Sequence, residues 1–311
     1  MASNKPSVFI DGEAGTTGLG IAARLQALPE VALRSLPPAQ RKDTAARRHM
    51  MAEVDLVILC LPDDAARDAV ALADGLGPDA PRLLDASTAH RVDPAWTYGF
   101  PEMMAGQSER IAVAPKVANP GCYPTGAIGL IRPLVEAGLI ARDYPISINA
   151  VSGYSGGGRT MIEAHDRDGG PAFELYGLGL EHKHVPETQL YAGLSRRPIF
   201  VPSVGHFRQG MLVSVPLHLD TLPGKPRGAE LHDALAAFYE GCTHVRVVEP
   251  ATGATLEPEA LNDTNRLELC VYANEARRQA VLVARLDNLG KGASGAAVQN
   301  LGLMLGLDGA V

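Results

Sequence analysis

Two patterns of hydrophobic positions divide the chain near residue 121. In the first part, short apolar runs alternate with helical patterns and with turns rich in Gly, Pro and Asp. The runs that we interpret as strands lie at 7–10, 31–36, 55–60, 82–85 and 111–114. The run at 55–60 is apolar throughout, which is typical of a strand buried on both faces of a parallel sheet. Repeated strand–helix units of this length predict an α/β fold with a Rossmann-like, doubly wound dinucleotide-binding domain.

The second part carries more strands and fewer helices. Candidate strands lie at 146–151, 211–219, 264–272 and 279–286. Such grouping predicts an α+β domain with a mostly antiparallel sheet. A last helical pattern at 298–305 is expected to pack back on the first domain. We therefore predict a nucleotide-binding domain formed by 1–121 with 287–311, and a catalytic and oligomerisation domain formed by 122–286.

Composition narrows the range of partners. The chain has 311 residues, 46% of them hydrophobic, and a net charge of −7, which argues against nucleic acid or an anionic membrane as the main partner. Its four cysteines form no C-x-x-C pair, so neither a zinc site nor a disulfide framework is indicated. No signal-peptide pattern and no long apolar run occur. We expect a cytoplasmic protein with a small-molecule partner.

A glycine-rich turn follows the first strand. Gly12, Gly15 and Gly18 have G-x-x-G-x-x-G spacing, with Thr16 and Thr17 between them, and a helical pattern comes next. Strand, glycine turn and helix are the order that a dinucleotide site requires, because the helix start binds pyrophosphate. The spacing is not the standard G-x-G-x-x-G, so a glycine turn without a ligand is the alternative.

The residues after the second strand bear on the choice of cofactor. No acidic side chain ends that strand, and hydroxyl and basic residues follow, namely Ser35, Arg41, Lys42, Arg47 and Arg48. Such groups suit a ribose 2′-phosphate, which favours NADP over NAD. A solvated basic helix face is the alternative. Ligands lie beyond the carboxyl ends of parallel strands, so Cys60, Pro62, Ser87 and Thr88 are candidates to line the nicotinamide end. Asp63 or Asp64 is expected to cap the helix that follows Pro62.

The turn Asn119-Pro120-Gly121-Cys122 carries the strongest chemical signal. It precedes an apolar helical run, so Cys122 is expected at a helix start, with Pro124 in the first turn. Backbone N–H groups and the helix dipole there favour the thiolate, which is the nucleophilic form. The alternative is a cysteine that serves only as a small buried hydrophobe.

Further candidate site residues lie in two glycine-rich segments and at three histidines. The glycine loop from Ser152 to Arg159 is compatible with a phosphate-binding nest or with a flexible surface loop. A second glycine-rich helix start follows Asp287. His182, His184 and His206 are candidates for general acid/base, because imidazole titrates near neutral pH. The H-x-H pair has no third ligand at a suggestive spacing, so we expect no metal.

These motifs together resemble the N-acetyl-gamma-glutamyl-phosphate reductase family, in particular its short branch, which is related to aspartate-semialdehyde dehydrogenase. The resemblance covers nearly the whole chain. It rests on the segments 11–18, 60–64, 119–125, 152–159, 182–187 and 287–295. It implies NADPH-dependent reduction of an acyl phosphate to an aldehyde in arginine biosynthesis, with Cys122 as the nucleophile.

The resemblance also implies roles for the histidines. His182 matches the first histidine of the H-R-H motif of the longer branch, for which an acid/base role is assigned. Where that branch has Pro-Met, this chain has His206-Phe207, which is similar to the Val-Gly-His of aspartate-semialdehyde dehydrogenases. Both histidines therefore stay candidates.

The expected contacts follow from these motifs. For NADP we expect Gly12, Gly15, Thr16, Thr17, Gly18, Ser35, Lys42, Cys60, Pro62, Ser87, Gly153, Gly156, Asn288 and Gly292. For the anionic substrate we expect Arg91, Asn119, Arg159, Lys183, Arg208 and Lys291. A homo-oligomer, dimer or tetramer, is expected from the open face of the second sheet.

Two alternative functions remain at this stage. One is a related reductase that acts on aspartyl or aminoadipyl phosphate, because spacing does not rank substrate side chains. The other, of a different class, is a non-catalytic NADP-binding sensor. A poised cysteine together with histidines and anion-binding loops favours the enzymes.

Overall fold

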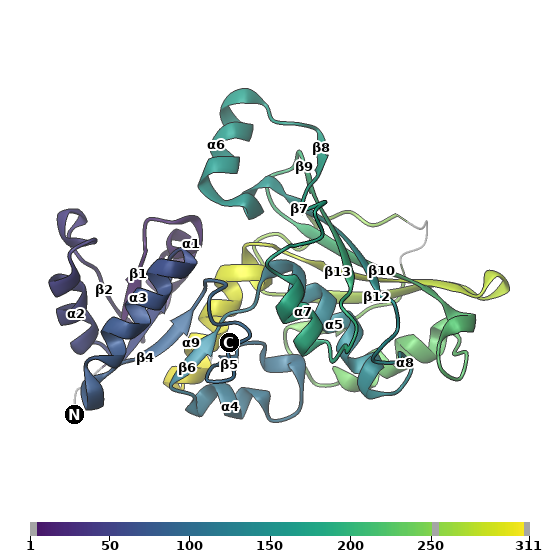
Figure 1. Cartoon of the computed structure of the whole chain (residues 1–311), viewed down its shortest axis with the longest axis horizontal. Helices are drawn as coiled ribbons and strands as arrows, with labels where there is room; N and C mark the ends of the chain where they lie inside the picture. Colours follow the sequence, from purple (N-terminus) through teal and green to yellow (C-terminus); the bar gives the residue numbers. More distant parts are fainter. Residues whose placement is uncertain (1–4, 251–254, 308–311) are drawn as a thin grey trace. The chain divides into compact units, whose positions relative to one another are not determined.

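The computed structural model describes residues 5–250 and 255–307, and it divides the chain into two compact units (Figure 1). The first unit comprises Met1–Pro120 and Ala293–Val311, and the second comprises Gly121–Gly292. The last segment of the chain thus returns to the first unit. The second boundary lies at 292/293 rather than at the expected 286/287.

The first unit contains a six-stranded sheet in the order β2-β1-β3-β4-β6-β5. Every neighbouring pair in it is parallel. The strands are β1 (Ser7–Asp11), β2 (Ala32–Arg34), β3 (Leu56–Leu59), β4 (Arg82–Asp85), β5 (Thr97–Tyr98) and β6 (Lys116–Ala118). All residues of β3 are buried, as its continuous apolar run predicts.

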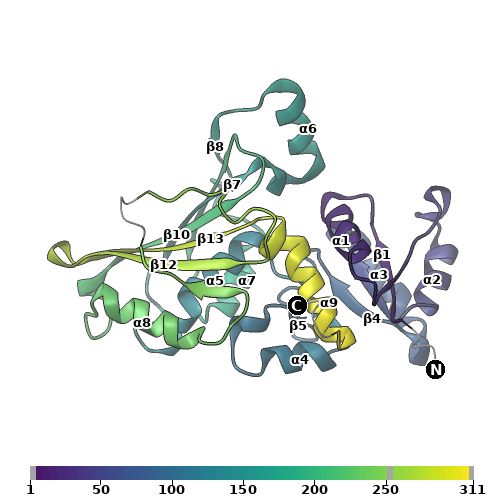
Figure 2. The same cartoon turned by 180° about the vertical axis from the view of Figure 1, so that it is seen from behind.

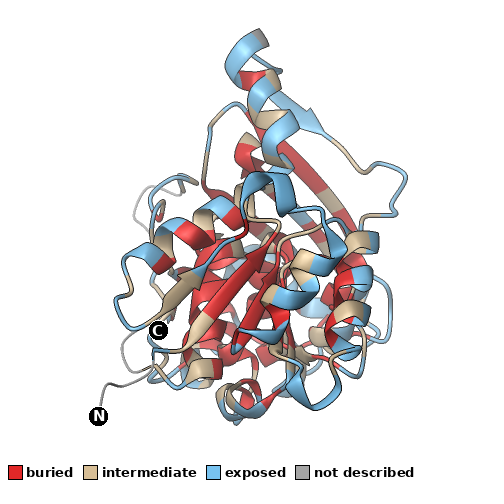
Figure 3. Ribbon diagram, turned by 90° about the vertical axis from the view of Figure 1, so that its left-hand side faces the viewer, coloured by how far each residue is buried: buried red, intermediate tan, exposed pale blue. Residues whose placement is uncertain are grey.

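Helices cover both faces of this sheet. They are α1 (Thr16–Gln26), α2 (Thr44–Ala52), α3 (Asp63–Asp74), α4 (Gln107–Val113) and α9 (Gly295–Leu305). On one face α1, α4 and α9 pack around Ile58 and Leu84. On the other face α2 and α3 pack around Val57 and Leu83. Figure 3 shows the buried strands between helices whose outer sides are exposed. The doubly wound α/β prediction is confirmed.

One predicted strand is wrong. The run 111–114 lies at the end of α4, where Ile111 is buried and Val113 is exposed, and the strand of this region is β6. A short apolar run fits one buried turn of a helix as well as it fits a strand. Helix α9 belongs to the first unit, in which it lies beside α4 (Figure 2).

Arg82 joins these two helices. Its guanidinium donates to the carbonyl oxygens of Ile111, Ala112 and Ala114 at the end of α4, and to that of Met304 near the end of α9. The last carbonyls of a helix have no partner within the helix and carry its negative dipole end. A single cation in β4 therefore satisfies the ends of two helices.

The second unit is built on a seven-stranded sheet in the order β11-β12-β13-β10-β7-β9-β8. Its strands are β7 (Ser147–Gly153), β8 (Phe173–Leu175), β9 (Ile199–Gly205), β10 (Met211–His218), β11 (Val245–Val247), β12 (Leu267–Asn274) and β13 (Gln279–Leu286). The pairs β7–β9 and β11–β12 are parallel and the other pairs are antiparallel. The prediction of a mostly antiparallel α+β domain is confirmed.

The two faces of this sheet differ. The helices of the unit are α5 (Cys122–Glu136), α6 (Gly158–Asp168), α7 (Val185–Tyr191) and α8 (Gly228–Phe238). Helix α5 packs on one face, where a Cβ on Gly126 would lie 2.9 Å from Val213 Cγ2. The opposite face carries a groove of about 640 Å³ lined by residues such as Leu212, Ser214, Val281 and Val283. Alternate residues of β10 thus serve the core and this open face.

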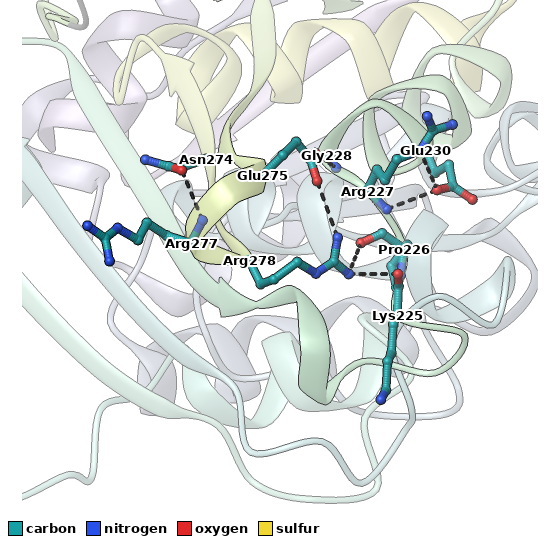
Figure 4. Close-up of polar contacts among 9 residues, drawn as sticks. All are labelled: Lys225, Pro226, Arg227, Gly228, Glu230, Asn274, Glu275, Arg277 and Arg278. Carbon is teal, nitrogen blue, oxygen red and sulfur yellow. Dashed lines mark hydrogen bonds and ion pairs between the residues drawn. The ribbon is translucent and has the colours of Figure 1, made fainter.

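A polar clamp fixes the turn between β12 and β13 to the start of α8 (Figure 4). Arg278 has a left-handed φ of 52°, and its guanidinium donates to the carbonyl oxygens of Lys225 and Pro226. Glu275 accepts from Arg278 and from the backbone N–H of Gly228. These bonds hold an exposed hairpin turn in one geometry. Within residues 5–250 and 255–307, no helix combines the length and apolarity that a bilayer crossing requires.

Candidate active site

Cys122 is the first residue of α5, as the sequence predicts. The residue before it, Gly121, has an extended conformation and has no side chain that could cap the helix. The first turn contains no acidic residue, and Cys122 is half-buried. The N–H groups of an uncapped first turn and the positive end of the dipole stabilise an anion, so this is an environment that favours a thiolate.

Gly292 lies directly against this cysteine. A Cβ on Gly292 would be 2.8 Å from Cys122 Cβ, which is closer than side chains tolerate. Gly292 belongs to a π-helical turn, Gly290–Ser294, and its N–H donates to the carbonyl oxygen of Asp287. Such turns occur often at functional sites. The sequence predicts Gly292 at the cofactor, and the structure places it against Cys122.

Asp287 and Asn288 fix that turn within the second unit. Asp287 is fully buried and accepts from Gln209 Nε2 at 2.7 Å and from the backbone N–H groups of Asp263 and Leu289. Asn288 Oδ1 accepts the N–H of Gly210, and its Nδ2 donates to Ser155 Oγ. These bonds explain why residues 287–292 belong to the second unit rather than to the first. They also leave the amide of Asn288 engaged with protein, in contrast to its expected role at a cofactor.

His182 lies beside the start of α5. Its ring centroid is 6.2 Å from that of Tyr123, the residue after the cysteine, and 5.7 Å from that of Tyr176. The backbone N–H of His184 donates to His182 Nδ1 at 3.1 Å, so the proton of the neutral ring is on Nε2. Burial, and then the charge of Lys183, lowers the pKa of His182 from 6.5 to about 4. His182 is therefore a neutral hydrogen-bond donor at physiological pH.

His184 shares this neighbourhood. It is buried, it is the residue before α7, and its ring centroid is 5.9 Å from that of Tyr123. Tyr176 donates to Tyr123 Oη, which donates to the carbonyl oxygen of Ser203. Burial raises the pKa of both tyrosines, with a further contribution from the negative charge of Cys122. The charge of Cys122 thus affects the ionisation of Tyr123 and Tyr176.

His206 lies in a different cluster. Its Nδ1 is 3.0 Å from Nδ1 of His165, and the two rings are stacked. Tyr154 stacks on His165 with a ring-centroid distance of 4.5 Å, and its ring centroid is 6.0 Å from that of His206. His206 is exposed, whereas His165 is buried. The structure therefore brings His182 and His184 to Tyr123, and it places His206 against α6.

The glycine loop is tightly engaged with the chain itself. The N–H groups of Gly153, Tyr154 and Ser155 donate to carbonyl oxygens of residues 207–210. A Cβ on Gly153 would lie 2.6 Å from the backbone of Arg208, and one on Gly156 would lie 2.8 Å from Ser152 Oγ. These N–H groups are not available to a phosphate. The nest interpretation fails for residues 153–155, and close packing explains the glycines.

The basic residues of this unit differ in exposure. Arg159, Lys183 and Arg208 are exposed, and Arg208 is 3.5 Å from Asp166. Lys291 is only 1% exposed and lies in the π-helical turn that carries Gly292. Lys291 is therefore the neighbour in sequence of Gly292, which contacts Cys122.

The glycine turn of the first unit has the geometry of an anion site. Gly15 is the residue before α1, no side chain caps that helix, and the first turn, which begins with Thr16 and Thr17, contains no acidic residue. Close packing explains why glycine occupies positions 12 and 18. Gly12 has a φ of 92° and a Cβ there would lie 2.3 Å from Cys60 O, while one on Gly18 would lie 2.7 Å from Gly12 O.

The basic residues near that turn are partly committed. Arg47 forms a 2.7 Å ion pair with Asp11, whose pKa is raised by burial in spite of this partner. Arg41 is 3.4 Å from Glu13, and Arg48 donates to the carbonyl oxygen of Gly75. Ser35 and Lys42 are exposed. The expectation that all these cations face a 2′-phosphate is therefore corrected for Arg47, which binds the strand end.

The residues at the ends of β3 and β4 are also engaged. Burial, and then the charges of Asp85 and Asp11, raises the pKa of Cys60 to about 12, so this thiol is not a nucleophile. Ser87 is buried and donates to Asp85 Oδ2 at 2.7 Å. Pro62, rather than Asp63 or Asp64, precedes α3 and is exposed. The predicted cap is wrong because Asp63 accepts from the backbone N–H of Thr88 instead.

Arg91 and Asn119 are buried in the first unit. Arg91 Nε donates to the carbonyl oxygen of Asn119 at 2.9 Å. Asn119 donates to the carbonyl oxygen of Ala293 and accepts from Asn300. These residues, expected at the substrate, hold the end of β6 where the chain leaves for Cys122. No cluster of three or more metal-binding side chains occurs among the residues that the structure describes.

Sequence reasoning missed two participants. Glu187 is 1% exposed and accepts the backbone N–H of Gly121 at 3.1 Å. Its only sequence signal is its place in the H-x-H-x-P-E stretch. Tyr176 carried no signal, because its contact with Tyr123 depends on tertiary structure.

The site and both units agree with one class of protein. Residues 122–288 match the family model described as the semialdehyde dehydrogenase, dimerisation domain. The solved structure of aspartate semialdehyde dehydrogenase II from Vibrio cholerae has a TM-score of 0.73 at 16% identity, and the match covers 98% of this chain and 99% of that one. The NADP-bound aspartate semialdehyde dehydrogenase of Candida albicans has a TM-score of 0.64 at 14% identity, with coverage of 97% and 100%. The fold is that of the semialdehyde dehydrogenases.

Sequence relatives narrow the class. N-acetyl-gamma-glutamyl-phosphate reductase 2 of Pseudomonas putida is 54% identical over 97% of both chains. N-acetyl-gamma-glutamyl-phosphate reductase of Burkholderia cenocepacia is 54% identical over 98% of this chain and 99% of its own. The chain belongs to the N-acetyl-gamma-glutamyl-phosphate reductase family, which consists of oxidoreductases of arginine biosynthesis. The resemblance found in the sequence motifs is confirmed.

Proposed function

We propose that this enzyme reduces N-acetyl-L-glutamyl 5-phosphate to N-acetyl-L-glutamate 5-semialdehyde and phosphate, with NADPH, through a thioester on Cys122. The observation that carries the proposal is the position of Cys122 at the start of α5, where the next residue, Tyr123, is in ring contact with the neutral His182. The names of relatives at 54% identity support the choice of substrate.

The residues of the first unit fit a dinucleotide. The uncapped start of α1 suits a pyrophosphate, which Gly15, Thr16 and Thr17 would hold. Exposed Ser35 and Lys42 would hold a 2′-phosphate, which supports NADP over NAD. When bound, NADPH supplies the hydride.

The chain's own groups manage the rest of the reaction. Cys122 Sγ attacks the acyl carbonyl carbon, the bond to phosphate breaks, and a thioester remains on Cys122. The N–H groups of the first turn of α5 donate to the carbonyl oxygen as negative charge develops on it. His182 Nε2–H donates a hydrogen bond to the same oxygen, and it keeps this bond to the thiohemiacetal oxyanion, which collapses to aldehyde and thiolate while the ring retains its proton. His184 and the Tyr123–Tyr176 pair fix the position of His182.

Cations of the second unit suit a substrate with phosphate and carboxylate groups. Lys291, Lys183, Arg159 and Arg208 are the proposed set, and Lys291 is placed by the turn that contacts Cys122.

The assembly and compartment follow from surface and thiol chemistry. The open face of the second sheet is apolar over a groove of about 640 Å³, which supports a homo-oligomer formed through this face, as the name of the matched domain suggests. None of the four cysteines forms a disulfide, which supports a reducing compartment, the cytoplasm.

Substitution of the nucleophile tests the proposal. Cys122→Ser should lose at least about 99% of turnover while retaining NADPH affinity, because the hydroxyl is not ionised at this position. Reduction of NADP is measured with phosphate and each of three semialdehydes, those of N-acetylglutamate, aspartate and aminoadipate. Retention of more than about a tenth of the wild-type rate would exclude the thioester. A preference for another semialdehyde would reassign the substrate, and NADP binding without turnover of any would indicate a sensor.

A further inference from the structure

Glu187 connects the histidine segment to the nucleophile. It lies in the first turn of α7, which begins directly after His184, and its carboxylate Oε2 accepts the N–H of Gly121 at 3.1 Å. Gly121 is the residue before Cys122. Because Glu187 is 1% exposed, this carboxylate is held by protein contacts rather than by water.

A buried carboxylate at this place has an electrostatic consequence. Burial of a carboxylate is costly unless it accepts hydrogen bonds, and the positive end of α5 lowers that cost. The same helix end stabilises the thiolate of Cys122. The charge of a carboxylate near the same helix start makes formation of the thiolate less favourable.

The same short helix also places the histidines. The backbone N–H of His184 fixes the ring of His182, and Thr188 Oγ1 donates to the carbonyl oxygen of His184 at 2.8 Å. Glu187 lies between these contacts in sequence and points to Gly121. One turn of α7 thus sets the geometry of the proposed nucleophile and of the proposed acid/base together.

We propose that Glu187 is a positioning residue for Cys122, which holds the Gly121 turn through its N–H and whose charge limits how readily the thiol ionises. The inference deepens the proposed function and depends on the role of Cys122 in it. A thiolate that is less stable is a stronger nucleophile once formed, so the carboxylate balances the fraction ionised against reactivity.

Other charged and titratable groups face the same region. Tyr123 lies on α5, Tyr176 follows β8, His182, Lys183 and His184 precede α7, and Lys291 lies in the π-helical turn. All of them remain in a Glu187→Gln variant. The difference between that variant and the wild type therefore isolates the charge of Glu187.

The test is the pH dependence of Cys122 alkylation. Wild type, Glu187→Gln and Glu187→Ala are treated with iodoacetamide between pH 5 and 10, and modification of Cys122 is followed by peptide mass analysis. Glu187→Gln keeps an oxygen for the Gly121 N–H and removes the charge, so the midpoint of the alkylation profile should fall by about one pH unit. Glu187→Ala removes the acceptor as well and should lower kcat by about tenfold.

A matched control is available on the same helix. Thr188→Val removes a buried hydrogen bond of α7 that does not involve Gly121, and its alkylation midpoint should equal that of the wild type. A Glu187→Gln midpoint equal to that of the wild type would overturn the inference, even if turnover fell. A shifted midpoint in a protein that reduces NADP with none of the three semialdehydes would instead support the role of Glu187 and contradict the proposed function.

Discussion

The backbone of Gly292 lies against the side chain of Cys122, so closely that a Cβ on Gly292 would be 2.8 Å from Cys122 Cβ. The carbonyl oxygen of Asp287, a fully buried residue, accepts the N–H of Gly292, and this bond helps to hold the turn in place. The position of Cys122 is therefore shaped by a turn more than 160 residues away in sequence.

Gly292→Ala should displace the thiol rather than unfold the protein. The added methyl group forces Cys122 or the turn to shift, and small misplacements of a nucleophile cost about tenfold to a hundredfold in rate. The measurement is kcat/KM with the melting temperature beside it. Gly179→Ala is the matched control, because a Cβ there meets nothing within 4 Å. Full activity of Gly292→Ala would show that the turn yields at no cost.

The acid side of the pH profile should reflect a neutral histidine. Because the pKa of His182 is lowered to about 4, the ring stays neutral from pH 7 down to about pH 5. Activity limited by this ring should therefore fall near pH 4, not near 6.5. NMR titration of His182, assigned with a His182→Asn variant, measures its midpoint directly. A midpoint near 6.5 would contradict the burial argument.

The same shift has a consequence for stability. The unfolded chain binds a proton at His182 below pH 6.5, whereas the folded protein resists it until about pH 4. Stability should decrease as pH falls from 6.5 to 4, and His182→Asn should remove that part of the decrease. Urea unfolding at pH 7, 5.5 and 4.5 compares the two proteins. An unchanged pH dependence in the variant would assign the decrease to other groups.

Two glycines of the first unit should respond differently to alanine. Gly12 has a φ of 92° and backbone 2.3 Å from a Cβ, so Gly12→Ala should destabilise the protein by about 3 kcal/mol. Gly15 has an ordinary φ of −78° and 3.5 Å of clearance, so Gly15→Ala should fold normally. Its methyl group should still weaken NADPH binding at the helix start. Thermal unfolding and fluorescence titration with NADPH separate the two effects, and equal melting temperatures would refute the first.

Arg82→Met should reveal how much the shared helix ends contribute. Removal of the guanidinium leaves several carbonyl oxygens of α4 and α9 without their donor, which should cost about 2–4 kcal/mol. Arg48→Met is the control, because it removes one exposed bond to a single carbonyl oxygen. Chemical unfolding monitored by circular dichroism provides the comparison. Equal losses for the two variants would deny Arg82 a special role.

Local rules account for much of the fold. The buried strand β3, the helix start at Cys122 and the returning helix α9 follow from apolar runs, turn residues and helical spacing. The same rules fail at 111–114, where one buried turn of α4 has the composition of a strand.

The functional site divides in the same way. The turn before Cys122 predicts this residue as a candidate, and the H-x-H-x-P-E motif predicts His182. Glu187 contacts Gly121 across 66 residues of sequence and Gly292 contacts Cys122 across 170, and no local pattern encodes such contacts. The glycine loop did not reveal its role in the sequence, because close packing and phosphate binding both select glycine. Only the hydrogen bonds of its N–H groups distinguish the two roles.

The late position of α9 affects how the chain is made. A ribosome releases the strands of the first sheet early, yet Ala297, Val298 and Leu301, which help to cover Ile58 and Leu84, emerge only after Gly121–Gly292 has been made. Until then, one face of the first sheet lacks the part of its apolar cover that α9 provides. A chain that ends shortly before residue 293 would therefore expose apolar surface of the first sheet, and chaperones and proteases would recognise it.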